Sequence, residues 1–494
     1  MKITELFSLG VDQMQVDFVD VNIDHDYPLY IDPYLISTRT DPWSVNVDRT
    51  IKSFFSAVAS NVRAGNNPRA IELFMFMSEP KETCLGISST GTTNGRGVGE
   101  GNATEIIEEI IRSRAIEMGV VQNIEDVIVF VDDVDKDKLS DMTTNIIRKH
   151  LIDYTKEQCE MWGIPLQRKE SLPYWDSQIE DWNSTWEEIL IYNGRELLLV
   201  PKAIVSPISE YNAQKYGWHF VVTNERNEQL ARRSSLVKLK KYKNGKEKYY
   251  LPKSDVDRYI SSKVLSGEFE SKKDYLRDYT QKRPELFERF RSTRAGLVSS
   301  LTNNDIASFS GAVDVTSIVD ALVVSLRSIP QGTSNASEYH HFIKCILEML
   351  FYPRLNNPTI EERIHDGRKR IDIVMSNIAT KGFFYSLHNV HKIPSGYIFI
   401  ECKNYTHDVG NPEIDQLSGR FAFNKGKFGL LMCRNVEDKP LLYKRCSDTY
   451  GDDRGLMIPL DDNDVILMLE SLKTDTDVTD ELLSRLTKSI ILGS

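Results

Sequence analysis

The chain has 494 residues, enough for roughly two to four domains with sizeable hydrophobic cores. Hydrophobic residues make up 40% of it and charged residues 27%, so a wholly disordered or collagen-like chain is excluded. Taken as one body, a chain with a formal net charge of −11 at pH 7 is poorly suited to a polyanionic partner such as DNA.

Residues 1–10 lack the basic and then apolar layout of a secretory signal, and no apolar run approaches the roughly 18 residues that span a bilayer. We therefore expect a soluble, cytoplasmic protein without a membrane partner. The six cysteines lie far apart without a Cys-x-x-Cys pair, which predicts reduced and mostly buried thiols instead of a zinc site or disulfides.

The charge is distributed unevenly along the chain. Residues 1–225 carry a net charge of −16, residues 226–300 carry +10, and the remaining residues carry −5. We expect three domains: an acidic mixed α/β domain over 1–225, a basic hairpin with a helical connector over 226–330, and a further α/β domain over 331–494. The acidic domain is a candidate sensor or regulator that competes with DNA for the basic segment.

The acidic domain is expected to be mixed α/β from its hydrophobic periodicity. Alternation predicts a strand over residues 15–22, and an apolar run predicts a buried strand over 124–131. Helices are expected over 103–118 and 141–159, the second with an inward face formed by Ile146, Ile147, Leu151 and Tyr154.

Two features of this domain are candidate ligand sites. The glycine-rich segment 91–101 opens a helix, as phosphate-binding loops do, but no Gly-Lys-Ser/Thr follows, so a flexible loop or lid is favoured. The acidic cluster Asp132, Asp133, Asp135 and Asp137 has the ligand type of a hard-cation site, although a solvated turn is the favoured interpretation.

The basic segment predicts a β-hairpin, with strands over 236–243 and 246–251 joined by Asn244-Gly245 in a type I′ turn. Its cations are interleaved with tyrosines, which is typical of nucleic-acid binding, where cations meet phosphates and rings stack on bases. A solvated hairpin explains the same charges, and both interpretations remain open. The candidate nucleic-acid contacts are Arg232, Arg233, Lys238, Lys240, Lys241 and Lys243.

Helical patterns follow the hairpin. Residues 253–297 form the expected helical connector, whose apolar faces are Tyr275, Tyr279, Leu286, Phe287 and Phe290. A second helical stretch over 313–328 precedes a Pro-Gln-Gly breaker at 330–332, which marks the start of the last domain.

The last domain opens with a helix that begins near Ser337, an N-cap candidate, and ends before Pro353. Glu338 lies at the head of its apolar stripe. A carboxylate in that place meets a cation or a metal, or else it caps the helix and interacts with the helix dipole.

Charged residues also lie inside two expected strands of this domain. The strand 371–375 turns Asp372 to one side, and the strand 397–403 places Glu401 and Lys403 on one face. Two carboxylates and a lysine on adjacent strands can hold Mg²⁺ by oxygen ligation and support a metal-activated water. A satisfied salt bridge between strands is the structural alternative.

These residues resemble the motifs of the PD-(D/E)XK, or restriction-endonuclease-like, nucleases. Asp372 matches the acidic residue of the first element, Glu401-Cys402-Lys403 matches the E-x-K element, and Glu338 lies in the preceding helix. Asp372 and Glu401 are 29 positions apart, which indicates an insertion, and isoleucine replaces the proline of the first element.

The resemblance covers roughly residues 335–470. It includes a helix that opens at Asn411-Pro412-Glu413 and carries Gln416, similar to an additional motif in several branches of the family. The later elements are expected in the αβββαβ order of the family's core, as strands over 428–433 and 456–460 and helices over 439–449 and 461–472.

The resemblance implies a restriction-endonuclease-like fold and Mg²⁺- or Mn²⁺-dependent hydrolysis of phosphodiester bonds. It implies that Asp372, Glu401 and the backbone carbonyl of Cys402 hold the metal. Glu338 would support a second metal or orient water, and Lys403 would position the nucleophile. The other implied contributors are Gln416 and Arg420, which orient Lys403 or contact the scissile phosphate, and the phosphate contacts His365, Arg368, Lys369 and Arg370, for which a plain basic loop is the open alternative.

The implied partner is nucleic acid, DNA in preference to RNA, in bacterial restriction or anti-phage defence. A homo-oligomer, a partner protein and an activating ligand all remain open. Two other functions also remain open: a catalytically inactive nucleic-acid-binding protein, and a nucleotide-sensing regulatory protein.

Overall fold

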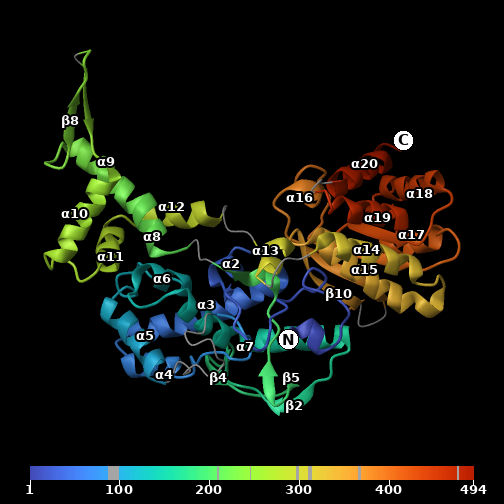
Figure 1. The fold of residues 1–494 in the computed structure, drawn as a ribbon, viewed down its shortest axis with the longest axis horizontal. Coiled ribbons are helices and arrows are strands. Elements are labelled where there is room, and N and C mark those ends of the chain that lie inside the picture. The colour runs from blue at the N-terminus through green and yellow to red at the C-terminus, as the bar shows by residue number, and fades with distance from the viewer. Residues whose placement is uncertain are drawn as a thin grey trace. The chain divides into compact units, whose positions relative to one another are not determined.

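The structure is a computed structural model that describes residues 1–86, 100–207, 211–244, 246–295, 300–309, 314–364, 369–474 and 478–493. It forms two compact units (Figure 1). The N-terminal unit contains Val21–Val200 and Ile204–Ser300, and the C-terminal unit contains Met1–Asp20, Pro201–Ala203 and Leu301–Ser494. The expected three domains follow the distribution of charge, whereas these two units follow packing.

The N-terminal unit is mixed α/β, as its periodicity predicts. Its helices are α2 (Pro33–Ser37), α3 (Pro42–Arg63), α4 (Asn67–Phe74), α5 (Glu100–Ser113), α6 (Val127–Phe130), α7 (Lys136–Trp162), α8 (Ala213–Tyr216), a π-helix (Gly217–Val221), α9 (Val222–Arg232), α10 (Lys253–Leu265), α11 (Lys272–Lys282) and α12 (Pro284–Ala295). The strands β2 (Gln167–Glu170), β5 (Trp186–Tyr192) and β6 (Arg195–Leu197) form one antiparallel sheet. Three antiparallel pairs accompany it: β1 (Tyr30–Ile31) with β7 (Val205–Ser206), β3 (Tyr174–Asp176) with β4 (Asp181–Asn183), and β8 (Lys238–Lys241) with β9 (Glu247–Tyr250).

Helix α7 is the longest helix of this unit, and its ends follow from local chemistry. The Asp135 carboxylate accepts a hydrogen bond from the backbone N–H of Lys138 at 3.0 Å, which caps the first turn. Gly163 ends the helix with a φ of 66°, a left-handed conformation that glycine adopts without strain. The expected inward face of this helix is confirmed, because Ile146, Ile147, Leu151 and Tyr154 are buried.

Two expected strands are wrong. Residues 15–22 contain isolated bridge residues, Phe18 (paired with Pro201) and Asn22, in place of a strand. Residues 124–131 form a turn of 3-10 helix (Ile124–Asp126) followed by α6, because a short apolar run fits a buried helix as well as a buried strand. The glycine-rich segment lies outside the described residues as far as residue 99, and α5 begins at Glu100.

A buried carboxylate, Asp126, joins the helical connector to the acidic segment. Its Oδ2 accepts hydrogen bonds from the backbone N–H groups of Gln122 and Asn123 at 2.9 Å each. Its Oδ1 accepts from the Tyr211 hydroxyl at 2.7 Å, and the Arg291 guanidinium of α12 forms an ion pair with the same carboxylate. Asp126 therefore fixes α12 against residues that lie more than 160 positions earlier in the chain.

The neighbouring carboxyl makes the stability of this unit depend on pH. Burial, together with the Asp126 carboxylate, raises the pKa of Glu125 from 4.5 to about 8. A carboxyl with a raised pKa in the folded state contributes stability that is complete below its unfolded pKa and is lost as the pH rises through its folded pKa. We predict that the free energy of unfolding falls between pH 4.5 and about 8, with up to about 1.4 kcal/mol per pH unit coming from Glu125.

Urea unfolding of the Glu125→Gln protein across this pH range checks the prediction, and the variant should lose this part of the slope. Glu117→Gln, at an exposed position of the same unit, is the control and should keep the wild-type slope. The prediction fails when all three proteins show the same pH dependence.

The C-terminal unit is built on a mixed five-stranded sheet. The strands are β10 (Leu355–Ile364), β11 (Lys369–Asn377), β12 (Tyr397–Lys403), β13 (Phe428–Cys433) and β14 (Leu456–Leu460), and they lie in this order in the sheet. The pairs β10–β11 and β11–β12 are antiparallel, whereas the pairs β12–β13 and β13–β14 are parallel. The bounds expected for β12, β13 and β14 are confirmed.

Helices surround this sheet (Figure 1). They are α1 (Ile3–Leu6), α13 (Asn303–Ser308), α14 (Val315–Ser328), α15 (Ala336–Phe351), α16 (Gly382–Asn389), α17 (Asn411–Ser418), α18 (Lys439–Gly451), α19 (Asp462–Ser471) and α20 (Val478–Leu492). Every residue of β13 and β14 is buried, as expected for parallel strands that are covered on both faces. Within the described ranges, no helix combines the length and apolar character that crossing a bilayer requires.

A buried ion pair ties the segments from early in the chain to α15 of the same unit. The Lys202 Nζ lies 2.9 Å from the Glu348 Oε1, and both side chains are fully buried. The Lys202 ammonium also donates to the Asn303 Oδ1 at 2.8 Å and lies 4.0 Å from the centre of the Tyr352 ring. The Lys202 backbone N–H donates to the Asp17 carbonyl at 2.9 Å, so residues 1–20 are part of this core.

We predict that Glu348→Gln destabilises the C-terminal unit by about 3 kcal/mol or more, because it leaves the buried Lys202 ammonium without its counter-charge. The double variant Lys202→Met/Glu348→Gln should be less destabilised than the sum of the single changes. Urea unfolding measures these differences, with Asp320→Asn as control. That change removes the partly exposed Asp320–Lys473 pair and should cost less than about 1 kcal/mol. Equal effects of Glu348→Gln and Asp320→Asn would contradict the prediction.

Candidate active site

Strands β11 and β12 separate at the point where the candidate carboxylates lie. Their pairing runs from Ser376↔Tyr397 to Ile373↔Ile400 and stops there. Asp372 and Glu401 are the first residues beyond the paired segment, one on each strand.

At this fork, where β11 and β12 separate, a hydrogen bond from the Asp372 side chain takes the place of a backbone hydrogen bond between the strands. Its Oδ2 accepts a hydrogen bond from the backbone N–H of Cys402 at 2.8 Å. In an extended strand the N–H and C=O of one residue point to the same side, so the Cys402 carbonyl also faces the fork.

Register places the candidate residues on one face of the sheet, as the alternation predicts. Val374 pairs with Phe399, so these two residues share a face. Side chains alternate along each strand, and therefore Asp372 lies on the face of Glu401 and Lys403.

The Glu401 carboxylate is fully buried and has three polar partners, two of which are cations. Its Oε1 accepts from the Lys403 Nζ at 2.7 Å and from the Gln416 Nε2 at 2.6 Å. The Lys403 ammonium also donates to the Gln416 Oε1 at 3.0 Å. The Arg420 guanidinium forms an ion pair with the other oxygen, Oε2. A buried charge is tolerated only with such partners, so these four residues form one interdependent cluster.

Helix α17 positions the polar groups that face Glu401. Its start is fixed because the Glu413 carboxylate accepts from the backbone N–H of Gly410 at 2.8 Å, with a proline in the first turn. Gln416 lies in its second turn, and Arg420 follows just beyond its end at Ser418. Burial lowers the pKa of the Arg420 guanidinium, and the Asp372 carboxylate opposes this shift. The carboxylates of Asp372 and Glu401 thus lie near two cations, Lys403 and Arg420.

The structure does not bring Glu338 to this group. Glu338 is exposed in the first turn of α15, where its carboxylate accepts from the Asn335 Nδ2 at 2.9 Å, and Asn335 takes the N-cap position expected for Ser337. His340 lies nearer, with its Nε2 3.8 Å from the Asp372 Oδ2.

Sequence reasoning missed His340 because the apolar stripe of α15 was placed one residue too early. The buried apolar residues of the helix include Tyr339, Ile343, Ile346, Leu347 and Leu350. With these residues facing the core, His340 lies on the side of the helix near Asp372, whereas Glu338 does not.

The basic residues before Asp372 are only partly covered by the structure. His365 and Arg368 lie outside the described residues. Lys369 and Arg370 belong to β11, but their side chains are also outside the described part, so their expected phosphate contacts stay predictions.

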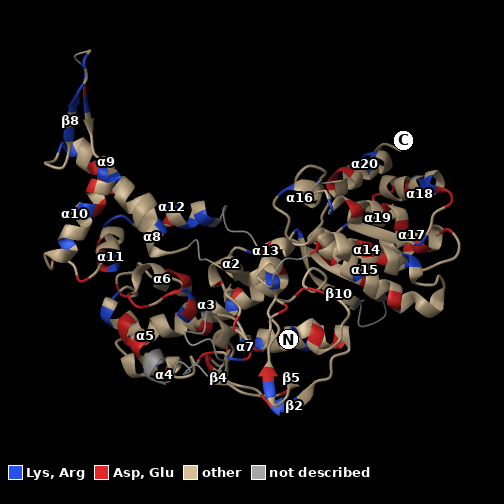
Figure 2. Ribbon diagram, in the orientation of Figure 1, with Lys and Arg blue, Asp and Glu red and all other residues tan. Residues whose placement is uncertain are grey.

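The other predicted nucleic-acid contacts lie in the N-terminal unit, on and beside the β8–β9 hairpin. Arg232 is paired with Glu228 at 3.3 Å, Lys238 with Asp255 at 2.6 Å and Lys241 with Glu247 at 2.9 Å. The remaining predicted contacts, Arg233, Lys240 and Lys243, are exposed. The expected hairpin is confirmed with shorter strands, while Gly245 of its expected type I′ turn lies outside the described residues, and Figure 2 shows its lysines along both strands.

The donor set at the fork fits a hard cation in chemical type. Mg²⁺ is commonly held by one or two carboxylates, with water and substrate phosphate completing its shell, which Asp372 and Glu401 with the Cys402 carbonyl can provide. The part of the chain that the structure describes contains no cluster of three or more His, Cys, Asp or Glu side chains arranged as metal ligands. Since both Glu401 oxygens already have cationic or amide partners, the partly exposed Asp372 is the carboxylate more open to a metal.

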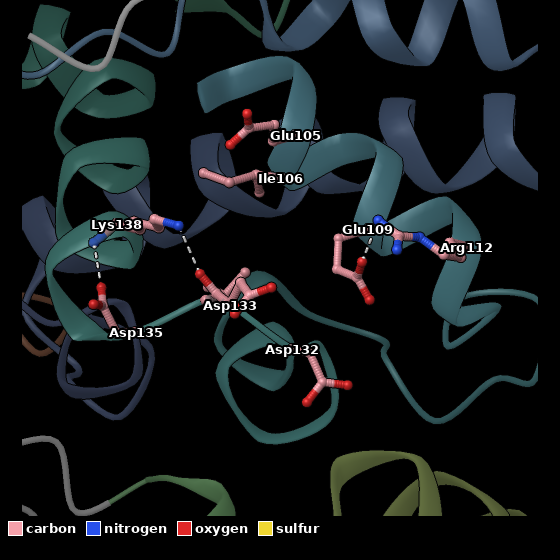
Figure 3. A pocket seen from close by; sticks show the side chains of 9 residues that line it. Glu105, Ile106, Glu109, Arg112, Asp132, Asp133, Asp135 and Lys138 are labelled. Atoms are coloured by element: carbon pink, nitrogen blue, oxygen red, sulfur yellow. Dashed lines mark hydrogen bonds and ion pairs between the residues drawn. The ribbon is translucent and has the colours of Figure 1, made fainter. Parts of the chain in front are cut away.

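A separate pocket of about 550 Å³ lies in the N-terminal unit at the predicted acidic cluster (Figure 3). The Asp132 Oδ2 accepts from the Ser271 hydroxyl at 2.7 Å, and Asp135 caps α7. The Lys138 ammonium donates to the Asp133 carbonyl at 2.8 Å. These acidic residues have structural partners, which favours the turn interpretation over a cation site. The pocket is lined by Glu105, Ile106, Glu109, Arg112, Asp132, Asp133, Val134, Asp135 and Lys138.

Comparison with known proteins concerns the first part of the chain. A family model described as a domain of unknown function (DUF8370) matches residues 8–212. The match ends before the β8–β9 hairpin and before the Glu401 group, and it includes residues of both compact units. No curated protein and no solved structure matches the chain.

We predict that Arg420 and Glu401 are strongly coupled. Arg420→Ala should destabilise the C-terminal unit by about 3 kcal/mol, because the buried Glu401 carboxylate loses a counter-charge. The same change in a Glu401→Gln background should cost at least about 1 kcal/mol less. A double-mutant cycle in urea checks this, with Arg454→Ala as control, because Arg454 pairs with the exposed Asp415 and should contribute little. Additive effects of the two changes would contradict the prediction.

Proposed function

We propose that the C-terminal unit is a Mg²⁺- or Mn²⁺-dependent nuclease of the PD-(D/E)XK type that hydrolyses phosphodiester bonds, with DNA favoured over RNA. The observation that carries the proposal is the convergence of Asp372, Glu401 and Lys403 at the fork of β11 and β12, with Gln416 bonded to both Glu401 and Lys403. A metal held there would activate water and stabilise charge on the phosphate.

The order of the elements also supports the proposal. α15, the antiparallel strands β10 to β12, α17 and the parallel strand β13 follow in the αβββαβ order that the resemblance implies. Helix α16 lies between β11 and β12, which agrees with the long separation of Asp372 and Glu401. The E-x-K residues end a buried strand, and a strand holds catalytic groups more rigidly than a loop does.

The side chains have distinct roles in this proposal. Asp372 and Glu401, with the Cys402 carbonyl, would hold the metal. Lys403 is fixed at 2.7 Å from Glu401, where its ammonium can donate to an attacking water or to a phosphate oxygen. The Arg420 guanidinium can transfer from the Glu401 carboxylate to the scissile phosphate, because a planar guanidinium recognises both anions.

One observation favours the rival function, a nucleic-acid-binding protein without catalysis. Lys403 and Gln416 donate hydrogen bonds to one oxygen of Glu401 and Arg420 forms an ion pair with the other, as in a structural salt bridge. In that case the cluster stabilises the sheet and binds no metal. Metal binding therefore separates the two functions.

The test is cleavage of plasmid DNA, single-stranded DNA and RNA by the purified full chain with Mg²⁺ or Mn²⁺. Asp372→Asn and Lys403→Met should each lower cleavage by about 100-fold or more, because each removes a group that acts on the metal or on the developing charge. Asp415→Asn is the matched control, since this exposed carboxylate precedes Gln416 on the same helix and should leave cleavage near the wild-type rate.

Calorimetric titration with Mn²⁺ gives a readout that does not depend on an activating ligand. The wild-type chain should bind Mn²⁺ and the Asp372→Asn chain should lose this binding. Absence of Mn²⁺ binding to a folded wild-type chain, or cleavage that survives in both active-site variants, would overturn the proposal.

A further inference from the structure

The β8–β9 hairpin has no buried face. Every residue of both strands is exposed, and an isolated two-stranded hairpin is marginally stable in water. Its base is anchored, because the Arg226 Nε donates to the carbonyl of the buried Leu251 at 2.6 Å and Lys238 pairs with Asp255 of α10. Figure 1 shows the two strands extending away from α9 and α10. The hairpin is thus an anchored arm with both faces open.

The two faces of the hairpin differ in charge. Register pairs Lys238 with Tyr250 and Lys240 with Lys248, and the Tyr242 N–H donates to the Lys246 carbonyl at 2.8 Å, which continues this ladder. One face, called the lysine face, therefore carries Lys238, Lys240, Tyr242, Lys246, Lys248 and Tyr250. The other face carries the pairs Leu239–Tyr249 and Lys241–Glu247, the second of which is an ion pair.

Lysines stand directly opposite each other on the lysine face. Lys240 and Lys248 are a cross-strand pair, and like charges in that position destabilise a hairpin. Of the described residues, no carboxylate forms an ion pair with either ammonium. Residues 232–253 contain nine basic residues and one acidic residue, a net charge of +8 in a chain whose total is −11. A polyanion lying along this face would attract both ammonium groups and so offset the repulsion between them.

The tyrosines indicate which polyanion fits. The Arg233 guanidinium lies 4.7 Å from the centre of the Tyr249 ring, and the Lys240 ammonium lies 5.3 Å from the centre of the Tyr242 ring. The lysine face carries four lysines and two tyrosines, and one of these tyrosines, Tyr242, already has the Lys240 ammonium over its ring, so phosphate contact is favoured over base stacking. A two-stranded ribbon also fits the major groove of duplex DNA, which is about 12 Å wide.

We propose that the lysine face of the β8–β9 hairpin is a docking surface for the phosphate backbone of duplex DNA. This inference goes beyond the proposed cleavage, because the hairpin lies in the N-terminal unit and carries none of the candidate catalytic residues. Binding at this surface requires no metal.

The test is fluorescence anisotropy of the full chain with a labelled duplex of about 30 base pairs, in EDTA and at several KCl concentrations. Lys240→Ala/Lys248→Ala should weaken binding by at least about 10-fold near 0.1 M salt and make the plot of log Kobs against log[KCl] less steep by about 1.8, or 0.9 for each lost phosphate contact. The matched control is Lys272→Ala/Lys282→Ala on α11, which makes the same change in charge and should leave both quantities near wild type.

Thermal unfolding of the lysine-face variant should match or exceed that of wild type, since the change removes a repulsive pair. Unchanged affinity and salt dependence in this variant would overturn the proposal. Tighter binding of single-stranded DNA, of RNA or of anionic vesicles than of the duplex would overturn it as well. Because binding is measured in EDTA, a failure of the metal-dependent cleavage proposal does not affect this result.

Discussion

The burial of one carboxylate determines the arrangement of the C-terminal unit. Glu401 lies two residues before the end of the central strand β12 and has no exposed surface, and an ionised carboxylate there requires compensating groups. Lys403, Gln416 and Arg420 supply them, and this requirement fixes α17 and the turn after it over one face of the sheet. The same groups give the site its chemistry, so stability and the proposed catalysis depend on the same contacts.

The sheet of this unit could be predicted from the sequence because its parallel strands are continuous apolar runs. β12, β13 and β14 have the expected bounds, and the alternation that placed Glu401 beside Lys403 is confirmed by their contact. Short elements were less predictable, since the run at 124–131 has no periodicity that separates helix from strand. Glu338 was misplaced for a related reason: a rotation of about 100° per residue moves a side chain off a helix face entirely.

The total charge of this chain does not describe the charge of any one of its surfaces. The charge of −11 is the sum of an acidic segment, with much of its acidity used in helix caps and ion pairs such as Asp126–Arg291, and a strongly basic hairpin. Carboxylates engaged in this way contribute structure, whereas the lysines of the hairpin remain open to solvent. The local field at a surface depends on the charges near it, because salt screens those more than about 8–10 Å away.

The buried Lys202 also bears on how this chain can be divided. Lys202 lies inside the segment 8–212 matched by the family model, and its counter-charge Glu348 lies outside that segment. A copy of the domain without residues 301–494 would keep Asp17 near Lys202 but lose Glu348, Asn303 and Tyr352, which surround its ammonium in this chain. The matched segment therefore does not contain all of the residues that surround Lys202 in this chain. In proteins where this domain is followed by a different one, a lysine at the position of Lys202 should indicate that the following domain supplies a buried carboxylate in the role of Glu348.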